Sequence, residues 1–280
     1  MSATIIDGKK IASEIKNEIS EQIVKTRLRP GLAVILVGKD PASELYVSLK
    51  QKAARSVGID VHMYRFAEDA AEQEIVEAIT WLNNDDEVHA ILVQLPLPKH
   101  LDANKIIQAI DPEKDVDGFH PKNIQRILES KNDITPGLSL GIIQLILASG
   151  IDLAQKQVVI VGKSPSFTGV LKHVIEAYDA KVSVIPPEEN ARAATQQADV
   201  LIVAAGKPGW ITDKDIKEGS VIIDVGTNKT IDNATMGDVD FASCVKKSAW
   251  ITPVPGGVGP MTVAMLLKNT VLLAQRRQAH

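Results

Sequence analysis

Val158-Val-Ile-Val-Gly-Lys-Ser164 joins four consecutive β-branched residues to a glycine and a short polar turn. Three more short apolar runs follow along the chain, at Lys181–Ile185, Val200–Ala204 and Ser220–Val225. The segments between the runs are long enough to form helices. Short strands that alternate with helices are typical of parallel sheets with helices on their faces. The second half of the chain is therefore predicted to be an α/β unit built on a parallel sheet.

The first half of the chain shows the same alternation. Its short apolar runs are Leu32–Val37, Ile59–Phe66 and Val88–Val93. In the neighbouring segments, apolar residues recur three and four positions apart, as they do on one face of a helix. The predicted fold class is therefore α/β, with two α/β domains and a cleft between them.

A polar, turn-rich segment at Glu129–Gly137 interrupts the periodicity and marks the predicted domain boundary. Residues 1–135 are predicted to form the first domain and residues 136–259 the second. One more apolar run, in residues 260–280, follows the last strand of the second sheet. We expect this run to be a helix that crosses back and completes the first domain.

Composition and charge restrict the class of protein. Of the 280 residues, 45% are hydrophobic and 24% are charged, as in ordinary globular proteins. The net charge is −4 with both signs interspersed, so neither nucleic acid nor a membrane is an expected partner. The N-terminus has no apolar leader, and the single cysteine, Cys244, fits a reducing compartment, so a cytoplasmic location is expected. The histidines show no metal-ligand spacing, and no metal is expected.

The segment Thr252-Pro-Val-Pro-Gly-Gly-Val-Gly-Pro-Met-Thr262 contains three glycines and three prolines directly before an apolar helical run. Glycine permits positive φ and a close approach of the backbone to another group. A helix that starts near Pro260 would also offer unpaired N–H groups to an electron-rich ligand. The segment is predicted to bring bare backbone to a ligand, and a stiff connection between domains is the alternative.

Tyr46 and Lys50 are four positions apart in a segment that is predicted to be helical. This spacing places the phenol and the ammonium on one face of the helix, about 6 Å apart at Cβ. A lysine that is partly buried beside an aromatic ring can exchange protons near neutral pH. The two side chains could therefore share a ligand, although this spacing alone more often marks a solvated helix face.

Gln94 and Asp117 are two further polar candidates. Gln94 follows the predicted strand Val88–Val93, at the carboxyl end where parallel sheets build ligand sites. Its neutral amide could hold a lysine amine without adding charge. Asp117 precedes Gly118 in an acidic loop and could accept two N–H bonds from the edge of a heterocycle. Strand termination and an Asx turn are the corresponding structural alternatives.

Taken together, these segments resemble the bifunctional methylenetetrahydrofolate dehydrogenase/methenyltetrahydrofolate cyclohydrolase family. The resemblance covers nearly the whole chain in the family's order. Beyond Tyr46 and Lys50, the segments that carry it are residues 7–9, 93–98, 114–119, 205–209, 224–226, 237–241 and 253–262.

The resemblance implies an activity in one-carbon metabolism. The implied reactions are the NADP-dependent oxidation of 5,10-methylenetetrahydrofolate to 5,10-methenyltetrahydrofolate and the hydrolysis of that product to 10-formyltetrahydrofolate. The substrate is thus a tetrahydrofolate derivative. The family also implies a homodimer in which a Rossmann-like second domain carries the dinucleotide.

The resemblance also implies roles for particular residues. Lys50 is implied as the central catalytic group, with Gln94 as its partner. Tyr46 is implied as a wall of the folate pocket and Asp117 as the anchor of the pterin. The further substrate-binding residues expected from the glycine-rich segment are Pro255, Gly256 and Gly257.

The cofactor side departs from the family pattern. The family usually has Gly-Arg-Ser-x-x-Val-Gly-x-Pro after this strand, whereas the chain has Gly162-Lys-Ser-Pro-Ser-Phe-Thr-Gly-Val170. Its second glycine, Gly169, is displaced by one position and could compensate if the helix starts later. Thr227 stands where isoleucine is usual. The cofactor-binding residues predicted from these segments are Gly162, Lys163, Ser164 and Thr227.

These departures leave three alternatives open. Lys163 keeps a positive charge where an arginine often faces the 2′-phosphate of NADP, whereas Glu188 or Glu189 could accept a ribose 2′-hydroxyl and favour NAD. The protein could also retain cyclohydrolase chemistry and use a dinucleotide poorly. The third alternative is a non-catalytic folate- or nucleotide-binding protein, against which Lys50 and Gln94 argue, since folding does not require them.

Overall fold

The computed structural model describes residues 2–131, 134–188, 191–229 and 234–278. The chain forms two compact units. Residues 13–137 and 263–280 make up the unit with a three-stranded sheet, and residues 1–12 and 138–262 the unit with a six-stranded sheet. The predicted α/β class with parallel sheets is confirmed.

The sheet of the three-stranded unit has the order β3-β2-β4 and is parallel throughout. The strands are β2 (Gly31–Val37), β3 (Asp60–Phe66) and β4 (Ala90–Val93). Every residue of β2 and β4 is buried, which explains their uninterrupted apolar sequences. The chain moves from β2 to β3 on one side and then returns to place β4 on the other, so a topological switch point lies between β2 and β4.

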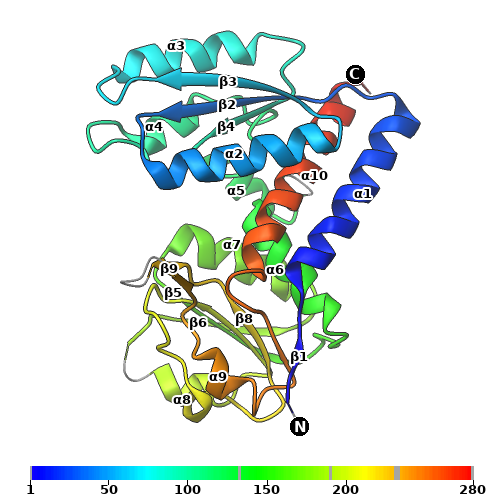
Figure 1. Cartoon of the computed structure of the whole chain (residues 1–280), viewed down its shortest axis with the longest axis vertical. Helices are drawn as coiled ribbons and strands as arrows, with labels where there is room; N and C mark the ends of the chain where they lie inside the picture. The colour runs from blue at the N-terminus through cyan, green and yellow to red at the C-terminus, as the bar shows by residue number, and fades with distance from the viewer. Residues whose placement is uncertain (1, 132–133, 189–190, 230–233, 279–280) are drawn as a thin grey trace. The chain divides into compact units, whose positions relative to one another are not determined.

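Helices cover this sheet, and Figure 1 shows α2 and α3 on opposite sides of it. One face of β2, which carries Ala33, Ile35 and Val37, packs in a buried cluster with Ile75 and Ile79 of α3. The helices that lie entirely within this unit are α2 (Pro41–Ser56), α3 (Glu72–Asn83), α4 (Ala103–Gln108) and α5 (Pro121–Leu128).

The six-stranded sheet has the order β1-β11-β8-β7-β5-β6, and each of its neighbouring pairs is parallel. Its strands are β1 (Thr4–Ile5), β5 (Gln157–Gly162), β6 (Lys181–Ile185), β7 (Val200–Ala204), β8 (Val221–Asp224) and β11 (Trp250–Ile251). Since β6 and β7 flank β5, the chain reverses direction there, and a second switch point lies between β5 and β7.

Short elements complete this unit. Its helices are α6 (Gly137–Ala148), α7 (Pro165–Glu176), α8 (Arg192–Thr195), α9 (Phe241–Cys244) and the 3₁₀ turn η2 (Asp213–Asp215). The strands β9 (Asn228–Lys229) and β10 (Thr235–Met236) form an antiparallel pair. The crossover between β6 and β7 therefore contains only a single helical turn in its described part.

The two ends of the chain differ in part from the sequence expectation. Residues 1–12 were expected in the first domain, but β1 pairs with β11, so these residues lie in the six-stranded unit. The helix α1 (Gly8–Thr26) starts there. The helix α10 begins at Val258, two residues before the expected start near Pro260, and continues to Gln278. Its residues from 263 onward belong to the three-stranded unit; the expected helix end at 279–280 lies outside the described residues.

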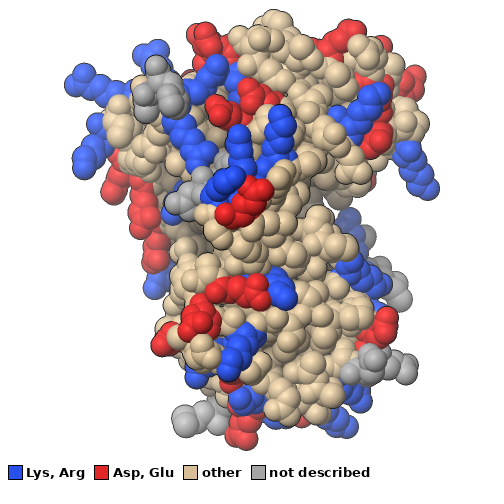
Figure 2. Space-filling view, turned by 180° about the vertical axis from the view of Figure 1, so that it is seen from behind, with Lys and Arg blue, Asp and Glu red and all other residues tan. Residues whose placement is uncertain are grey.

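Charged side chains are mixed on the surface. On the face that Figure 2 shows, lysines and arginines alternate with aspartates and glutamates rather than gathering in one stripe. No helix in the described ranges combines the length and the apolar character needed to cross a bilayer.

Candidate active site and dinucleotide-binding loops

Lys50 and Gln94 meet at the switch point of the three-stranded unit. Nζ of Lys50, on α2, donates a 3.0 Å hydrogen bond to Oε1 of Gln94, directly after β4. The backbone N–H of Gln94 donates to the carbonyl oxygen of Ile35 at 2.9 Å, and its side-chain Nε2 donates to the carbonyl oxygen of Leu95. Gln94 is buried, whereas Lys50 is half-buried. The amide is thus fixed in place, and its oxygen faces the lysine.

Tyr46 lies one helical turn before Lys50 on α2, and 45% of its surface is exposed. Asp117 lies within electrostatic reach of Lys50. Burial raises the pKa of the Asp117 carboxyl to about 6, while the Lys50 ammonium lowers this pKa and the Asp115 carboxylate raises it. The structure therefore couples a lysine, an amide and a carboxyl, with a tyrosine on the same helix as the lysine.

The loop that carries Asp117 is held by residues that the sequence analysis did not single out. The buried carboxylate of Asp115 accepts hydrogen bonds from the backbone N–H groups of Gly118 and His120, at 3.2 and 2.8 Å. Gly118 has φ +71°, and a Cβ there would lie 2.7 Å from the carbonyl oxygen of Ile134. In the sequence, this turn is signalled by Asp115, which stands three residues before Gly118.

Asn269 is a second supporting residue that the sequence analysis missed. It lies on α10, is buried, and donates from Nδ2 to the carbonyl oxygens of Val116 and Thr135, each at 3.0 Å. Val116 precedes Asp117, so this amide fixes the backbone beside the carboxyl. A single asparagine in an apolar helix was the only sequence signal for it.

The glycine-rich segment packs tightly within the six-stranded unit. Gly256 has φ +113° and its carbonyl oxygen accepts a 3.1 Å hydrogen bond from the N–H of Lys9. A Cβ on Gly257 would lie 2.7 Å from the carbonyl oxygen of Pro253, and a Cβ on Gly8 would collide with the carbonyl oxygen of Gly257. Gly8 is therefore needed where the N-terminal segment packs on the glycine-rich segment, and Gly257 is needed for the fold of that segment itself, in addition to any role toward a ligand. Pro255 is exposed.

The predicted dinucleotide loop connects β5 to α7 at the second switch point. Ser164 caps α7, and the N–H of Phe167 donates to its Oγ at 3.5 Å. A Cβ on Gly162 would lie 2.8 Å from Cγ2 of Thr168, so glycine permits close packing of the strand end on the helix. The helix α7 begins at Pro165, so Gly169 lies inside it, and the later helix start that would let Gly169 compensate for the displaced glycine is not observed.

The other predicted cofactor residues are at the same edge of the sheet. Lys163 is exposed on the loop after β5, and Thr227 is exposed on the loop after β8. Glu188 is exposed on the loop after β6, and Glu189 lies outside the described residues. All these loops follow carboxyl ends of parallel strands, where open α/β sheets bind their ligands.

Asp238 organises two of these loops, and the sequence analysis gave it no role. Its carboxylate accepts hydrogen bonds from the successive N–H groups of Ala205, Gly206 and Lys207, at 2.6, 3.0 and 2.8 Å. It also accepts one from Nδ2 of Asn228 at 2.8 Å. Asp238 is completely buried, so it fixes the turn after β7 and the segment after Thr227 together.

Asp224 supports this arrangement from the end of β8. Its carboxylate accepts the N–H groups of Gly226, Asp238 and Val239, at 2.9, 3.0 and 2.9 Å. Burial raises the pKa of Asp224 to about 6, although these backbone hydrogen bonds lower it. The two motifs Asp224-Val-Gly226 and Gly237-Asp-Val239 therefore meet to form one buried carboxylate network.

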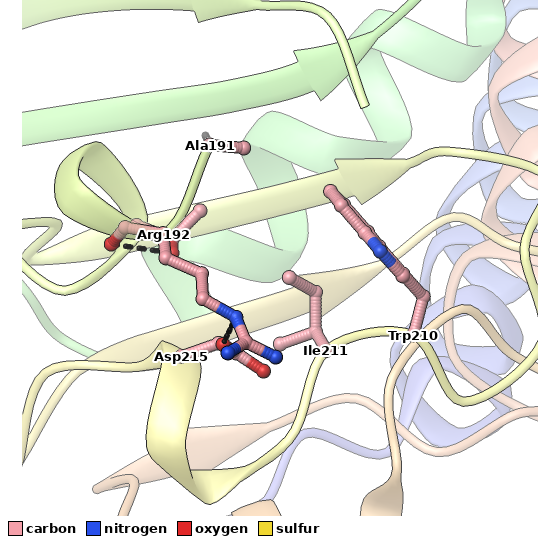
Figure 3. Close-up of a pocket in the computed structure, with 6 residues that line it drawn as sticks. Ala191, Arg192, Trp210, Ile211 and Asp215 are labelled. Atoms are coloured by element: carbon pink, nitrogen blue, oxygen red, sulfur yellow. Dashed lines mark hydrogen bonds and ion pairs between the residues drawn. The ribbon is translucent and has the colours of Figure 1, made fainter. Parts of the chain in front are cut away.

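A pocket of about 440 Å³ lies beside the short α8. Ala191, Arg192, Trp210, Ile211 and Asp215 line it, with Thr195 (Figure 3). Nε of Arg192 lies 2.6 Å from Oδ1 of the buried Asp215. The two charged side chains that line the pocket thus already pair with each other. Across the described residues, no cluster of histidine, cysteine and acidic groups is suited to hold a metal ion.

Two parallel sheets, each with polar side chains at its switch point, place the chain in the α/β class, whose ligand sites lie at such points. A family model described as the tetrahydrofolate dehydrogenase/cyclohydrolase catalytic domain matches residues 6–117, and the NAD(P)-binding-domain model of the same family matches residues 136–278. The chain therefore belongs to the tetrahydrofolate dehydrogenase/cyclohydrolase family.

Individual relatives resemble this chain in sequence and structure over nearly its full length. The bifunctional protein FolD of Acetivibrio thermocellus is 44% identical over 279 residues, which cover 98% of each chain. A crystal structure of the FolD enzyme of Campylobacter jejuni superimposes with a TM-score of 0.95 at 42% identity, covering 99% of this chain and 100% of that one.

A solved relative also contains a dinucleotide. The FolD enzyme of Trypanosoma brucei, in complex with NADP and an inhibitor, superimposes with a TM-score of 0.95 at 33% identity and full coverage of both chains. The expected family, the bifunctional dehydrogenase/cyclohydrolase activity and the use of a folate with NADP are confirmed by these comparisons.

Proposed function

We propose that the Lys50–Gln94 pair and Asp117 form the folate site at which this chain oxidises 5,10-methylenetetrahydrofolate and hydrolyses the methenyl product to 10-formyltetrahydrofolate. The observation that carries this assignment is the 3.0 Å hydrogen bond between Nζ of Lys50 and Oε1 of Gln94, with the Asp117 carboxyl in electrostatic reach. A lysine held by a neutral amide at a sheet switch point is not needed for folding, so a chemical role accounts for it best.

The hydrolysis requires a water oxygen to bond to the cationic N–C–N carbon of the methenyl group and one C–N bond to break. Both protons leave the water oxygen as it becomes the formyl oxygen: one is delivered to the nitrogen that is released, and the other passes to solvent. Lys50 is the group proposed to hold and transfer these protons, because an amine can take up and return a proton in one place. Gln94 keeps the amine in position with an uncharged acceptor.

The other predicted substrate-binding residues are proposed to orient the substrate. The Asp117 carboxylate is proposed to accept N–H bonds from the pterin edge, a geometry that suits an amidine-like heterocycle. Tyr46 is proposed to stack along the folate, since this residue is 45% exposed and lies on the lysine face of α2. Pro255, Gly256 and Gly257 are proposed as further substrate contacts on the strength of the glycine-rich motif.

The six-stranded unit fits a dinucleotide. The N-terminus of α7 follows β5 within three residues at the switch point, and Gly162 lets the strand end and the helix pack closely. Gly162, Lys163, Ser164 and Thr227 are proposed to hold it. When bound, NADP accepts the hydride that leaves the methylene carbon of the folate, and the protein contributes chiefly orientation to that step.

Two assays on the purified protein test the proposed function. One follows the reduction of NADP or NAD with 5,10-methylenetetrahydrofolate, and the other follows the hydrolysis of 5,10-methenyltetrahydrofolate without a dinucleotide. Both activities, with NADP as the better oxidant, are expected. Methenyl hydrolysis alone would identify a cyclohydrolase with an impaired cofactor loop, and the absence of both activities would leave a binding protein.

We also propose a cytoplasmic homodimer. The strand β6 is an edge of the six-stranded sheet in the described part of the chain, and 38% of the Val184 surface is exposed on it. Unpaired backbone groups on an edge strand can pair with a second chain. Light scattering on the intact protein and on Val184→Lys tests this assignment, because a lysine at that edge is expected to shift a dimer toward monomer, and a wild-type monomer would contradict it.

A further inference from the structure

The loop after β7 holds a lysine against the end of β6. Nζ of Lys207 donates a 2.6 Å hydrogen bond to the carbonyl oxygen of Pro187, and it lies 4.9 Å from the centre of the Trp210 ring. Pro187 is the second residue after the end of β6. The half-buried ammonium of Lys207, which lies on the loop after β7, is thus fixed at the carboxyl end of β6.

The backbone of Lys207 is fixed as well. Its N–H donates to Oδ1 of the buried Asp238 at 2.8 Å, and the two preceding N–H groups donate to Oδ2 of the same carboxylate. A lysine anchored at both its N–H and its Nζ loses less conformational freedom on binding a ligand than a free surface lysine would.

The end of β6 is also where a dinucleotide presents its adenosine ribose. In doubly wound sheets that bind a pyrophosphate after the first strand, the residue that meets the ribose 2′ position follows the second strand, roughly 20 residues after the glycine loop. Here that region reads Pro186-Pro187, and proline has no N–H to offer. The N–H of Glu188 already donates to the carbonyl oxygen of Pro186 at 2.9 Å, so residues 186–188 leave no free backbone donor for a phosphate, and a side chain from another loop can supply one.

We propose that Lys207 is the specificity-determining residue that recognises the 2′-phosphate of NADP. An ammonium has three N–H donors, and Pro187 takes one, so two remain for phosphate oxygens. The ligand chemistry is a phosphate monoester on the adenosine ribose. This inference rests on the proposed function of the six-stranded unit and assigns the selectivity to a loop different from that of Lys163.

Calorimetric titration of the full chain with NADP, NAD and 2′,5′-ADP tests the proposal without relying on turnover. For Lys207→Met, the affinities for NADP and 2′,5′-ADP are expected to fall at least about tenfold, as for a lost charged hydrogen bond. The affinity for NAD is expected to change by less than about twofold. Lys207→Arg keeps the charge and is expected to retain most of the NADP preference. Lys246→Met, at an exposed lysine of the same unit, is the matched control.

Three results would overturn the assignment. An equal loss of NADP and NAD affinity in Lys207→Met would show that the lysine only ties the two loops together. If Lys207→Met kept the wild-type affinities for both NADP and NAD, the 2′-phosphate would have to bind elsewhere. A wild-type protein that bound neither dinucleotide would refute the proposed dehydrogenase function itself, whereas the first two results leave that function intact.

Discussion

Lys50 and Gln94 are 44 positions apart in the sequence, yet Nζ of Lys50 donates a 3.0 Å hydrogen bond to Oε1 of Gln94. The sheet register explains the meeting, because β2 lies between β3 and β4 and its end is joined to α2. The N–H of Gln94 donates to the carbonyl oxygen of Ile35, so the backbone of Gln94 stays in place when the lysine side chain moves. A neutral acceptor orients the amine without adding the negative charge that a carboxylate would bring.

Replacing Gln94 by leucine removes the acceptor and keeps a similar volume. We expect the rate of methenyl hydrolysis to fall about tenfold to a hundredfold, since a hydrogen bond to a charged group contributes about 1.5–3 kcal/mol. Steady-state hydrolysis without dinucleotide measures the effect. An unchanged rate constant would show that Lys50 does not depend on this amide.

Because the pKa of the Asp117 carboxyl is raised, we expect folate binding to depend on pH. Its pKa is raised to about 6, so it is ionised above that pH and becomes protonated below it. Protonation converts an acceptor of two N–H bonds into a partial donor, so the affinity for folate is expected to fall as the pH drops from 7 to 5. Titration of Asp117→Asn should give weaker binding that varies less over this range. Wild-type affinity that stays constant from pH 7 to pH 5 would contradict the anchoring role.

Asp238 is expected to be critical for stability. Asp238→Ala leaves three backbone N–H groups and the Asn228 amide without their acceptor, and each buried unpaired donor costs about 1–3 kcal/mol. We expect the free energy of unfolding, measured in urea, to decrease by about 3 kcal/mol or more. Asp240→Ala is the control, because its side chain makes no capping hydrogen bond to α9. Equal effects of both substitutions would refute the network.

A substitution at Gly169 tests where α7 starts. No atom lies within 4 Å of a Cβ built on this glycine, which lies inside the helix. Gly169→Ala is therefore expected to stabilise the protein by up to about 1 kcal/mol and to leave dinucleotide affinity unchanged. Thermal unfolding and NADP titration of the same sample check both points. A large loss of NADP affinity would mean that Gly169 belongs to the pyrophosphate loop after all.

Much of the fold was predictable from local patterns. The buried parallel strands β2, β4 and β7 each coincide with an uninterrupted apolar run, and β5 and β8 each contain one, because both faces of these strands are covered. The pairing of β1 with β11 was not predictable, since strands of two residues carry no periodic signal. Side-chain spacing likewise indicated Tyr46 and Lys50 on one helix face.

The supporting residues of the sites were harder to find. Asn269 and Asp238 act on backbone groups that are distant in sequence, at Val116 and Ala205 respectively. Such hydrogen bonds depend on tertiary packing, and a single polar residue in an apolar segment does not show which backbone group it meets. Gly257 and Gly8 could be recognised as special from the sequence, but their contact with each other could not.

The most direct test of the account compares Lys50→Met with Lys52→Met, an exposed lysine on the same helix. Methenyl hydrolysis, NADP affinity and unfolding are measured on one preparation of each variant. The account predicts that Lys50→Met loses hydrolysis by about a hundredfold or more while it folds and binds NADP normally, and that Lys52→Met behaves like the wild type. A Lys50→Met protein with wild-type hydrolysis would contradict the central catalytic assignment.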